Sequence, residues 1–356
     1  MKKPVVVLLL VFVMIGTKAQ TNSSGALLVL SKEDHTLAVV NPSTLKVVAK
    51  VPVGDDPHEV IVSADGKTAY VSIYGGGSLH TINVIDLVAQ KRLEDIDTKP
   101  LFGPHGLAFA NNKLWFTAEG SKAVASYNPV AGKLDWCMGT GQDRTHMLYV
   151  TGNAKKIYTT NVSSGTVSIL QDTILPFKNM PPPPNGGAGV GMKPPPPGGI
   201  PQGRKRENWV QQVIPTSAGS EGFDVLPDGT FLWTASAEDG HIHIIDLVTR
   251  AKVASIDAKV KGANRLAFTP DGRLAFISSL GSGEVIIYDV KTRKLVKQVN
   301  IGHGAAGLLM DPDGTRAFVA CTPDNYIAVI DLKTLNVTGK LEAGGSPDGL
   351  AWAAAK

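Results

Sequence analysis

The sequence predicts an all-β fold in which seven similar sheets form a closed ring. Three observations support this: a pattern of short apolar runs recurs six times in the 356-residue chain, its period is about 42 residues, and glycine-containing turns separate the runs. Each period holds four runs, which predicts four antiparallel strands per sheet. A four-stranded repeat of this length is typical of a β-propeller blade, so we expect a seven-bladed β-propeller.

The six copies share a first apolar run, a turn and a second apolar run. They begin at Asp56, Gly103, Thr145, Ser220, Ala263 and Ala305. Four of the turns contain an Asp-Gly pair, which favours a tight hairpin because glycine tolerates a positive φ. These pairs are Asp65-Gly66, Asp228-Gly229, Asp271-Gly272 and Asp313-Gly314. Since the runs are apolar on both faces, each sheet needs a neighbour on both sides, and a ring provides it.

The seventh blade is expected to combine both ends of the chain. Residues 350–352 match the first strand of the repeat, but the chain ends before the other three strands. The segment Ala26–Val53 matches the second to fourth strands and leads directly into the first repeat. We therefore expect the last blade to be closed by both termini, which removes exposed sheet edges.

The N-terminus predicts export. Residues 1–19 begin with two lysines after Met1, followed by an apolar run of about eleven residues and a small-residue site ending at Ala19. This is typical of a signal peptide, and the run is too short to span a bilayer as a helix, although a retained anchor is the alternative. We expect a periplasmic, secreted or cell-surface protein, with residues 20–356 as one soluble, monomeric domain and no transmembrane anchor after cleavage.

The composition excludes two classes of protein. Three of the 35 basic residues lie in the leader, which leaves 32 against 31 acidic residues and makes nucleic acid an unexpected partner. The two cysteines, Cys137 and Cys321, lie far apart in the repeat pattern and cannot form a disulfide framework. Stability must come from a buried core.

One blade carries a long insertion. Residues 172–208 hold two runs of four prolines and seven glycines, a composition that cannot build a core. They join the expected third strand of blade 3, Thr166–Leu170, to its fourth, Trp209–Ile214. The insertion is expected to leave the ring opposite the start of the first strands, either as a tolerated surface excursion or as an arm that docks a partner.

The first strand of every blade lines the centre of a propeller, so equivalent residues of these strands should meet at one end. The residues in question are His58, His105, His146, Glu221, Asn264, Ala306 and Asp348. Imidazole and carboxylate groups suit a divalent metal such as zinc, manganese or calcium, and the candidate ligands are His58, His105, His146 and Glu221. The alternative is a solvated channel in which these groups bind water.

Loops after the second strands should reach the same end, and they contribute Glu119, Asn161 and the segment Lys32–His35. Arginine can bind anions by paired hydrogen bonds, and carboxylates and amides bind hydroxyl groups. We therefore expect a small polar or anionic ligand, with an envelope protein as the alternative partner. The candidate ligand-binding residues are Arg144, Asn161, Asn264, Arg265 and Asp348.

Several second strands carry a recognisable sequence: YTTN at Tyr158–Asn161, AYVS at Ala69–Ser72, and LWTA and AFVAC in later blades. With the VID-type strand that follows each, they resemble the YVTN-repeat (YncE-like) propellers over nearly all of the chain after the leader. The resemblance implies an exported seven-bladed propeller. Its relatives range from ligand binding to lactone hydrolysis, lyase chemistry and a redox-enzyme subunit, so the fold alone does not select an activity.

Three functions follow as hypotheses. The first is an exported ligand- or protein-binding scaffold, because the repeats contain no compact catalytic motif and no catalytic residue is assigned. The second is a metal-dependent lactonase, another hydrolase or a lyase that uses the His and Glu residues at the same end of the ring. The third is an accessory subunit of a redox enzyme, since the sequence has no haem attachment motif of its own.

Overall fold

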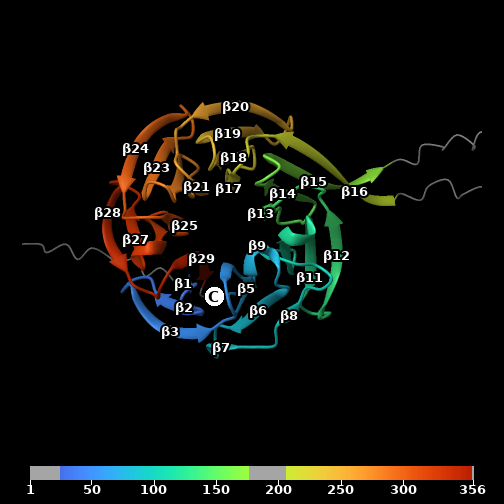
Figure 1. Cartoon of the computed structure of the whole chain (residues 1–356), viewed down its shortest axis with the longest axis horizontal. Coiled ribbons are helices and arrows are strands. Elements are labelled where there is room, and N and C mark those ends of the chain that lie inside the picture. Colours follow the sequence, from blue (N-terminus) through green and yellow to red (C-terminus); the bar gives the residue numbers. More distant parts are fainter. Residues whose placement is uncertain (1–24, 176–205, 355–356) are drawn as a thin grey trace, which may run out of the picture.

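The computed structural model describes residues 25–175 and 206–354. Within these ranges, seven sheets surround a common axis (Figure 1). The predicted fold class is confirmed, because the chain is a seven-bladed β-propeller with antiparallel blades. The predicted leader, residues 1–19, lies outside the described residues.

The first three blades follow one another along the chain. Blade 1 contains β4 (Pro57–Val62), β5 (Thr68–Ile73), β6 (Thr81–Asp86) and β7 (Lys91–Arg92), and β8 (Ile96–Asp97) also pairs with β6. Blade 2 contains β9 (Pro104–Ala110), β10 (Lys113–Ala118), β11 (Ala123–Asn128) and β12 (Lys133–Gly139). Blade 3 contains β13 (Thr145–Val150), β14 (Lys156–Asn161), β15 (Thr166–Leu175) and β16 (Arg206–Pro215).

The next three blades have the same order. Blade 4 contains β17 (Ser220–Val225), β18 (Phe231–Ser236), β19 (His241–Asp246) and β20 (Ala251–Asp257). Blade 5 contains β21 (Ala263–Phe268), β22 (Leu274–Ser279), β23 (Glu284–Asp289) and β24 (Lys294–Asn300). Blade 6 contains β25 (Ala305–Met310), β26 (Arg316–Cys321), β27 (Tyr326–Asp331) and β28 (Asn336–Leu341).

Blade 7 joins the two ends of the chain as predicted. Its innermost strand is β29 (Pro347–Ala354), and its outer strands are β1 (Gly25–Ser31), β2 (Thr36–Asn41) and β3 (Lys46–Pro52). β29 and β1 pair antiparallel, with Leu27 opposite Trp352 and Leu28 opposite Ala351. This pairing closes the ring without an unpaired inner edge in blade 7.

One apolar cluster lies at each of the seven interfaces between neighbouring blades. β1 shows why the strands are apolar on both faces. Its Leu27 and Val29 pack towards blade 6, whereas Leu28 and Leu30 pack towards blade 1, and all four are fully buried. Because alternate side chains of a strand point to opposite faces, a sheet with two neighbours needs a continuous apolar run.

The loops after three second strands form short 3-10 helices: η1 (Gly75–Gly77), η2 (Glu119–Ser121) and η3 (Thr322–Asp324). The turns at the opposite ends of the second strands use the predicted Asp-Gly pairs. At the first of them, Gly66 has φ 75°, and the Asp65 carboxylate accepts a hydrogen bond from the Lys67 amide at 3.1 Å. In the ranges that the structure describes, no helix is long and apolar enough to cross a bilayer.

The hairpin that carries the insertion is longer than expected. β15 continues to Leu175 and β16 begins at Arg206, so ordered pairing extends into both ends of the expected loop 172–208. The pairing includes Thr173 opposite Asn208. Backbone pairing satisfies the polar groups of this extension, so the strands can continue beyond the blade core. The rest of the insertion lies outside the described residues.

Candidate functional site

The second residue of each innermost strand lies at the end of the ring axis where those strands begin, an end that we call the mouth. These residues are the ones that the repeat pattern aligned: His58, His105, His146, Glu221, Asn264, Ala306 and Asp348. Pairing with the second strand shifts register beside them, as between Thr145 and Leu148 in blade 3. A bulge of this kind turns a side chain out of the regular ladder, here towards the axis.

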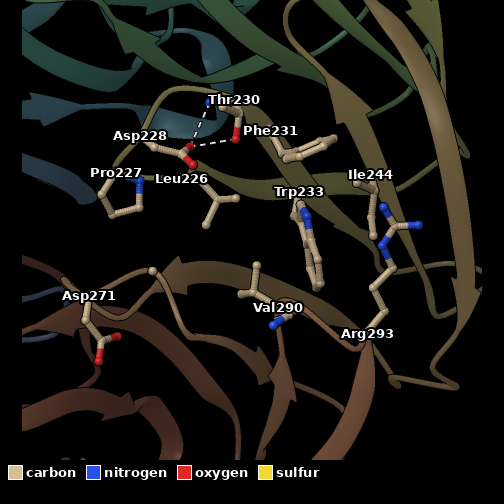
Figure 2. A pocket seen from close by; sticks show the side chains of 12 residues that line it. Leu226, Pro227, Asp228, Thr230, Phe231, Trp233, Ile244, Asp271, Val290 and Arg293 are labelled. Atoms are coloured by element: carbon tan, nitrogen blue, oxygen red, sulfur yellow. Dashed lines mark hydrogen bonds between the residues drawn. The ribbon is translucent and has the colours of Figure 1, made fainter.

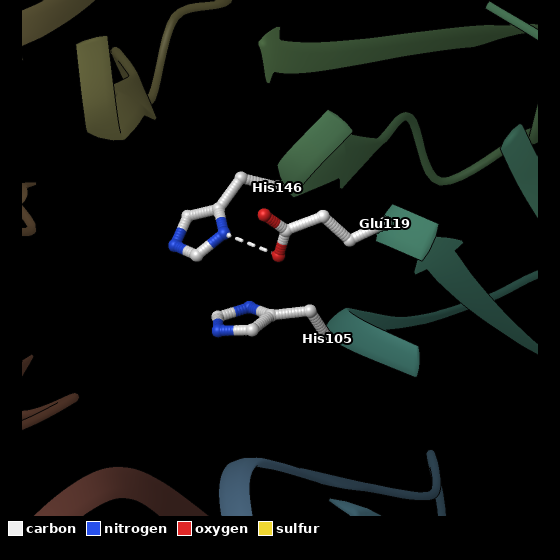
Figure 3. A group of neighbouring side chains, drawn as sticks. All are labelled: His105, Glu119 and His146. Carbon is white, nitrogen blue, oxygen red and sulfur yellow. Dashed lines mark hydrogen bonds and ion pairs between the residues drawn. The ribbon is translucent and has the colours of Figure 1, made fainter. Parts of the chain in front are cut away.

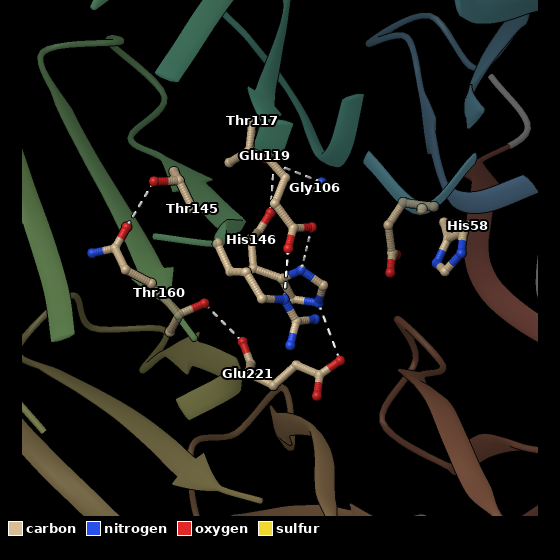
Figure 4. A network of polar contacts seen from close by, with 12 residues as sticks. His58, Gly106, Thr117, Glu119, Thr145, His146, Thr160 and Glu221 are labelled. Atoms are coloured by element: carbon tan, nitrogen blue, oxygen red, sulfur yellow. Dashed lines mark hydrogen bonds and ion pairs between the residues drawn. The ribbon is translucent and has the colours of Figure 1, made fainter. Parts of the chain in front are cut away.

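Hydroxyl groups from one blade fix the mouth residues of the next. Thr117 Oγ1 donates a hydrogen bond to the His146 carbonyl at 2.5 Å, and Thr160 Oγ1 donates to the Glu221 carbonyl at 2.7 Å (Figure 4). Ser278 Oγ donates to the Ala306 carbonyl at 2.7 Å in the same way. Because these bonds join different blades, they set the spacing between neighbouring mouth side chains.

Glycine follows four of the mouth residues, and close approach of the next blade explains it. A Cβ on Gly307 would lie 1.9 Å from the Asp348 carbonyl oxygen, and one on Gly349 would lie 2.3 Å from that of His58. No larger residue fits without moving the backbone. The innermost strands therefore pack directly against one another at this level.

His146 bridges two carboxylates. Its Nδ1 lies 3.2 Å from Glu119 Oε2, and its Nε2 lies 3.1 Å from Glu221 Oε1 (Figure 4). Burial opposes protonation of the ring, but the hydrogen bonds to Glu119 and Glu221 outweigh it and raise the pKa of His146. Burial likewise opposes ionisation of Glu119, yet His146 and Arg144 lower its pKa to about 2. The two carboxylates therefore favour the protonated form of the ring that lies between them.

His105 stacks against His146 with ring centroids 3.8 Å apart, and it is 1% exposed. Burial and the neighbouring charge of His146 hold the pKa of His105 well below its usual value, so its ring is neutral. Its Nδ1 is buried and has no hydrogen-bond partner. An unsatisfied buried nitrogen is uncommon in proteins and marks a place where a ligand atom could bind.

Blades 4, 5 and 1 contribute a second part of the mouth. Asn264 Nδ2 donates to Glu221 Oε1 at 3.1 Å, whereas Asn264 Oδ1 is buried without a partner. Arg265 forms an ion pair with Glu59, and its Nη1 lies 3.8 Å from Glu221 Oε1. The neighbouring carboxylates of Glu59 and Glu221, with that of Asp348, outweigh burial and raise the pKa of Arg265.

His58 and Asp348 lie in a third part of the mouth. His58 Nε2 lies 2.9 Å from Asp56 Oδ1, and this hydrogen bond lowers the pKa of Asp56 to about 2. Lys32 Nζ lies 2.6 Å from Asp348 Oδ2 and 3.3 Å from His58 Nδ1. Both ring nitrogens of His58 therefore have partners, although its ring centroid is only 4.9 Å from that of His105.

The predicted metal ligands are only partly brought together. In the described part of the chain, one group offers three ligand atoms that all lie within 4.8 Å of one another: His105, Glu119 and His146 (Figure 3). The carboxylate of this group comes from Glu119, which the sequence placed in a neighbouring loop, and not from the predicted Glu221. Glu221 binds the far nitrogen of His146, and His58 is occupied elsewhere.

Of the five predicted ligand-binding residues, four lie at the mouth and one does not. Asn264, Arg265 and Asp348 lie at the mouth, and Arg144 Nε donates to Glu119 Oε1 at 2.7 Å. Asn161 differs from the prediction, because its fully buried amide bonds Thr145, Thr166 and Ser168 within blade 3. Its position at the end of a second strand suggested exposure, but the side chain turns into the blade.

Sequence reasoning missed Glu59, the residue after His58. The aligned position is glycine in four blades, Glu59 in blade 1 and Arg265 in blade 5. These two opposite charges at the same repeat position were the signal that could have predicted an ion pair. The two cysteines are free, as predicted, with Cys137 exposed and Cys321 buried.

A separate pocket of about 380 Å³ lies between blades 4 and 5, beside their Asp-Gly turns (Figure 2). Leu226, Trp233 and Val290 line it with the turn residues Asp228 and Asp271. Asp228 accepts hydrogen bonds from the Thr230 amide and hydroxyl, so its carboxylate serves the turn. No predicted site residue lines this pocket.

No protein-family model and no curated protein sequence matches the chain. Solved structures do. A functionally unknown protein from Desulfotomaculum acetoxidans superposes with TM-score 0.68 at 13% identity, covering 94% of this chain and 100% of that one. A candidate 6-phosphogluconolactonase from Bacteroides fragilis gives TM-score 0.68 at 16% identity, with 94% and 99% covered. Kuenenia stuttgartiensis hydrazine synthase gives TM-score 0.64 at 16% identity, with 90% and 99% covered.

These likenesses define the class of the protein, a seven-bladed β-propeller, and at such identities they show the fold alone. The mouth of this propeller is rich in charged and imidazole side chains. Any function must be argued from the side chains there.

Proposed function

We propose that this propeller is an exported binding protein that holds a small polar ligand at its mouth. One observation carries the proposal: His105 Nδ1 and Asn264 Oδ1 are buried at the mouth without hydrogen-bond partners, although the side chains around them are paired. Leaving such atoms unsatisfied costs roughly 1–3 kcal/mol each, which a bound ligand would recover. The predicted leader supports export.

The charges at the mouth favour a ligand that donates hydrogen bonds or carries positive charge. The permanent cations of the mouth all face carboxylates: Arg144 faces Glu119, Arg265 faces Glu59, and Lys32 faces Asp348. Asp56 and Glu221 add two further carboxylates. Negative groups thus outnumber permanent positive ones, and an anion would have to displace an existing ion pair, at a cost in free energy.

The redox-subunit alternative has support from the shared fold only, and the lactonase and lyase alternatives also need a group that can take up a substrate proton. His146 is held between two carboxylates, so its ring is not free to act as a general base, which needs a neutral nitrogen within reach of a substrate proton. A binding role requires no such group. This difference makes binding the function that the mouth geometry supports best.

Thermal denaturation of the chain without its leader tests the proposal. The probes are amines, amino acids, sugar alcohols and simple lactones, and the variants are Asn264→Ala at the mouth and Asn336→Ala on the exposed face of β28 as the matched control. We expect at least one amine or polyol to raise the melting temperature of the wild type and of the control but not of Asn264→Ala. Turnover of a lactone, or no stabilisation by any probe, would overturn the proposal.

A further inference from the structure

We propose that His105, Glu119 and His146 form a binding site for a divalent transition metal ion. The inference rests on the proposed binding function, because the bound ion would help to hold the polar ligand at the mouth. Their nearest ligand atoms lie within 4.8 Å of one another. Ligands on one tetrahedral ion with bonds of ~2.1 Å lie about 3.4 Å apart, so closure needs side-chain movements of only about 1 Å. His105 and His146 come from innermost strands of neighbouring blades, and Glu119 lies in η2 between them.

The unsatisfied nitrogen of His105 is the independent observation that points to a ligand. His105 is 1% exposed, and its Nδ1 has no partner. Figure 3 shows this side of the ring facing Glu119 and His146. A metal ion placed among the three side chains would satisfy this nitrogen with a bond of ordinary length. The ion would replace any proton on His146 Nδ1, which is released to water on binding because only an unprotonated nitrogen binds a metal.

Second contacts hold the other two ligands in the orientation that a metal needs. Arg144 Nε binds one oxygen of Glu119 at 2.7 Å and leaves the other oxygen facing His146 Nδ1. Glu221 Oε1 binds His146 Nε2 at 3.1 Å, on the side of the ring away from Glu119. A carboxylate on the outer nitrogen of a metal-bound histidine is a recurrent arrangement that fixes the ring and strengthens the ligand.

The donor set selects the ion. Two imidazole nitrogens and one carboxylate oxygen suit zinc and neighbouring transition metals, whereas calcium prefers oxygen ligands only. Three protein ligands would leave a fourth position open to water or to an organic molecule at the mouth. Of the ions expected from the sequence, zinc and manganese remain compatible with these donors, and calcium is not.

Metal titration of tag-free, chelator-treated protein tests the site. The probes are Zn²⁺ by calorimetry and Co²⁺ by its visible absorption, with Ca²⁺ as a third probe. The variants are His105→Ala and Glu119→Gln, and the control is His303→Ala, which removes an exposed histidine 3.0 Å from the Asp324 carboxylate. We expect one Zn²⁺ or Co²⁺ per chain, an affinity reduced by about 100-fold or more in both site variants, and no change in the control.

The inference would be overturned if neither Zn²⁺ nor Co²⁺ bound stoichiometrically. It would also be overturned if the site variants bound these ions as tightly as the wild type, or if the wild type preferred Ca²⁺. X-ray absorption of the zinc-loaded wild type gives a test that does not depend on folding of the variants, and we expect two imidazoles in the first shell. If metal does not bind but amines or polyols still stabilise the protein through Asn264, this inference fails and the proposed function stands. If metal binds and no organic probe does, the reverse holds.

Discussion

Arg265 and Glu59 form a buried ion pair between blades 5 and 1, although 206 residues separate them in the sequence. The two blades lie on opposite parts of the ring (Figure 1), so the guanidinium reaches across the axis. Both side chains are nearly excluded from solvent, at 11% and 12% exposure. This pair connects innermost strands that have no backbone pairing with each other.

Breaking this pair should destabilise the fold. Glu59→Ala leaves the guanidinium buried without its main partner, which costs about 3–5 kcal/mol in comparable cases. The control is Arg273→Met, because Arg273 is 77% exposed and pairs with Asp271 at the surface, where we expect a change below about 0.5 kcal/mol. Urea unfolding measures both free energies. A Glu59→Ala variant as stable as the wild type would show that Arg265 is adequately solvated or paired without Glu59.

Replacing Gly307 with alanine should disturb the packing of innermost strands. The new Cβ would lie 1.9 Å from the Asp348 carbonyl oxygen, so β25 and β29 must separate. We expect a loss of about 2–3 kcal/mol in unfolding free energy, in the upper range for overpacking. Gly139→Ala is the control, since its Cβ would meet no atom within 4 Å and Gly139 has no positive φ. Equal stability of the two variants would contradict the close approach.

The sequence was sufficient to predict the ring and the residues that meet at its mouth. Every blade repeats the same strand order, so one alignment placed His105, His146, Glu221 and Asn264 on equivalent positions. The shared blade followed from the same alignment, because Ala26–Val53 and residues 350–352 each supply the strands that the other lacks.

The alignment could not predict which mouth residues pair. It gives the strand position of a side chain, whereas pairing depends on rotamers and on distances across the axis. Glu59 reaches Arg265 on the far side of the ring, and Glu119 reaches His146 from a loop of the preceding blade. Asn161 turned inward because Thr145, Thr166 and Ser168 offer its amide partners that no repeat pattern reveals.

Closure of the ring by β29 should be required for cooperative folding. Deleting residues 347–356 removes the partner of β1 and exposes the apolar side chains of Leu27 and Leu28. We expect loss of a sharp thermal transition and aggregation through the unpaired edge. A synthetic peptide of residues 346–356 should restore the transition, and deletion of residues 355–356 alone should leave it unchanged. Retention of cooperative melting in the long deletion would refute closure.

Asp224 lies between blades 4 and 5 and should make the free energy of unfolding depend on pH. Its carboxylate accepts hydrogen bonds from the Phe268 amide of blade 5 at 2.9 Å and the Val225 amide at 2.8 Å. Burial nevertheless outweighs these bonds and raises the pKa of Asp224 from 3.8 to about 6. Because the folded-state pKa exceeds the unfolded value, the stabilising contribution is complete below about pH 4 and is lost as the pH rises through about 6.

The variant Asp224→Asn isolates this effect, because asparagine does not titrate and keeps one acceptor oxygen. We expect the unfolding free energy of the wild type, relative to that of the variant, to fall by about 2 kcal/mol between pH 4 and pH 7. Asp228→Asn is the control, since Asp228 lies in an exposed turn where hydrogen bonds from Thr230 lower its pKa. Urea unfolding at several pH values gives the comparison. If the difference between wild type and Asp224→Asn is the same at pH 4 and pH 7, the Asp224 carboxyl ionises in the folded protein as readily as in the unfolded chain, and burial between the two blades does not control its charge.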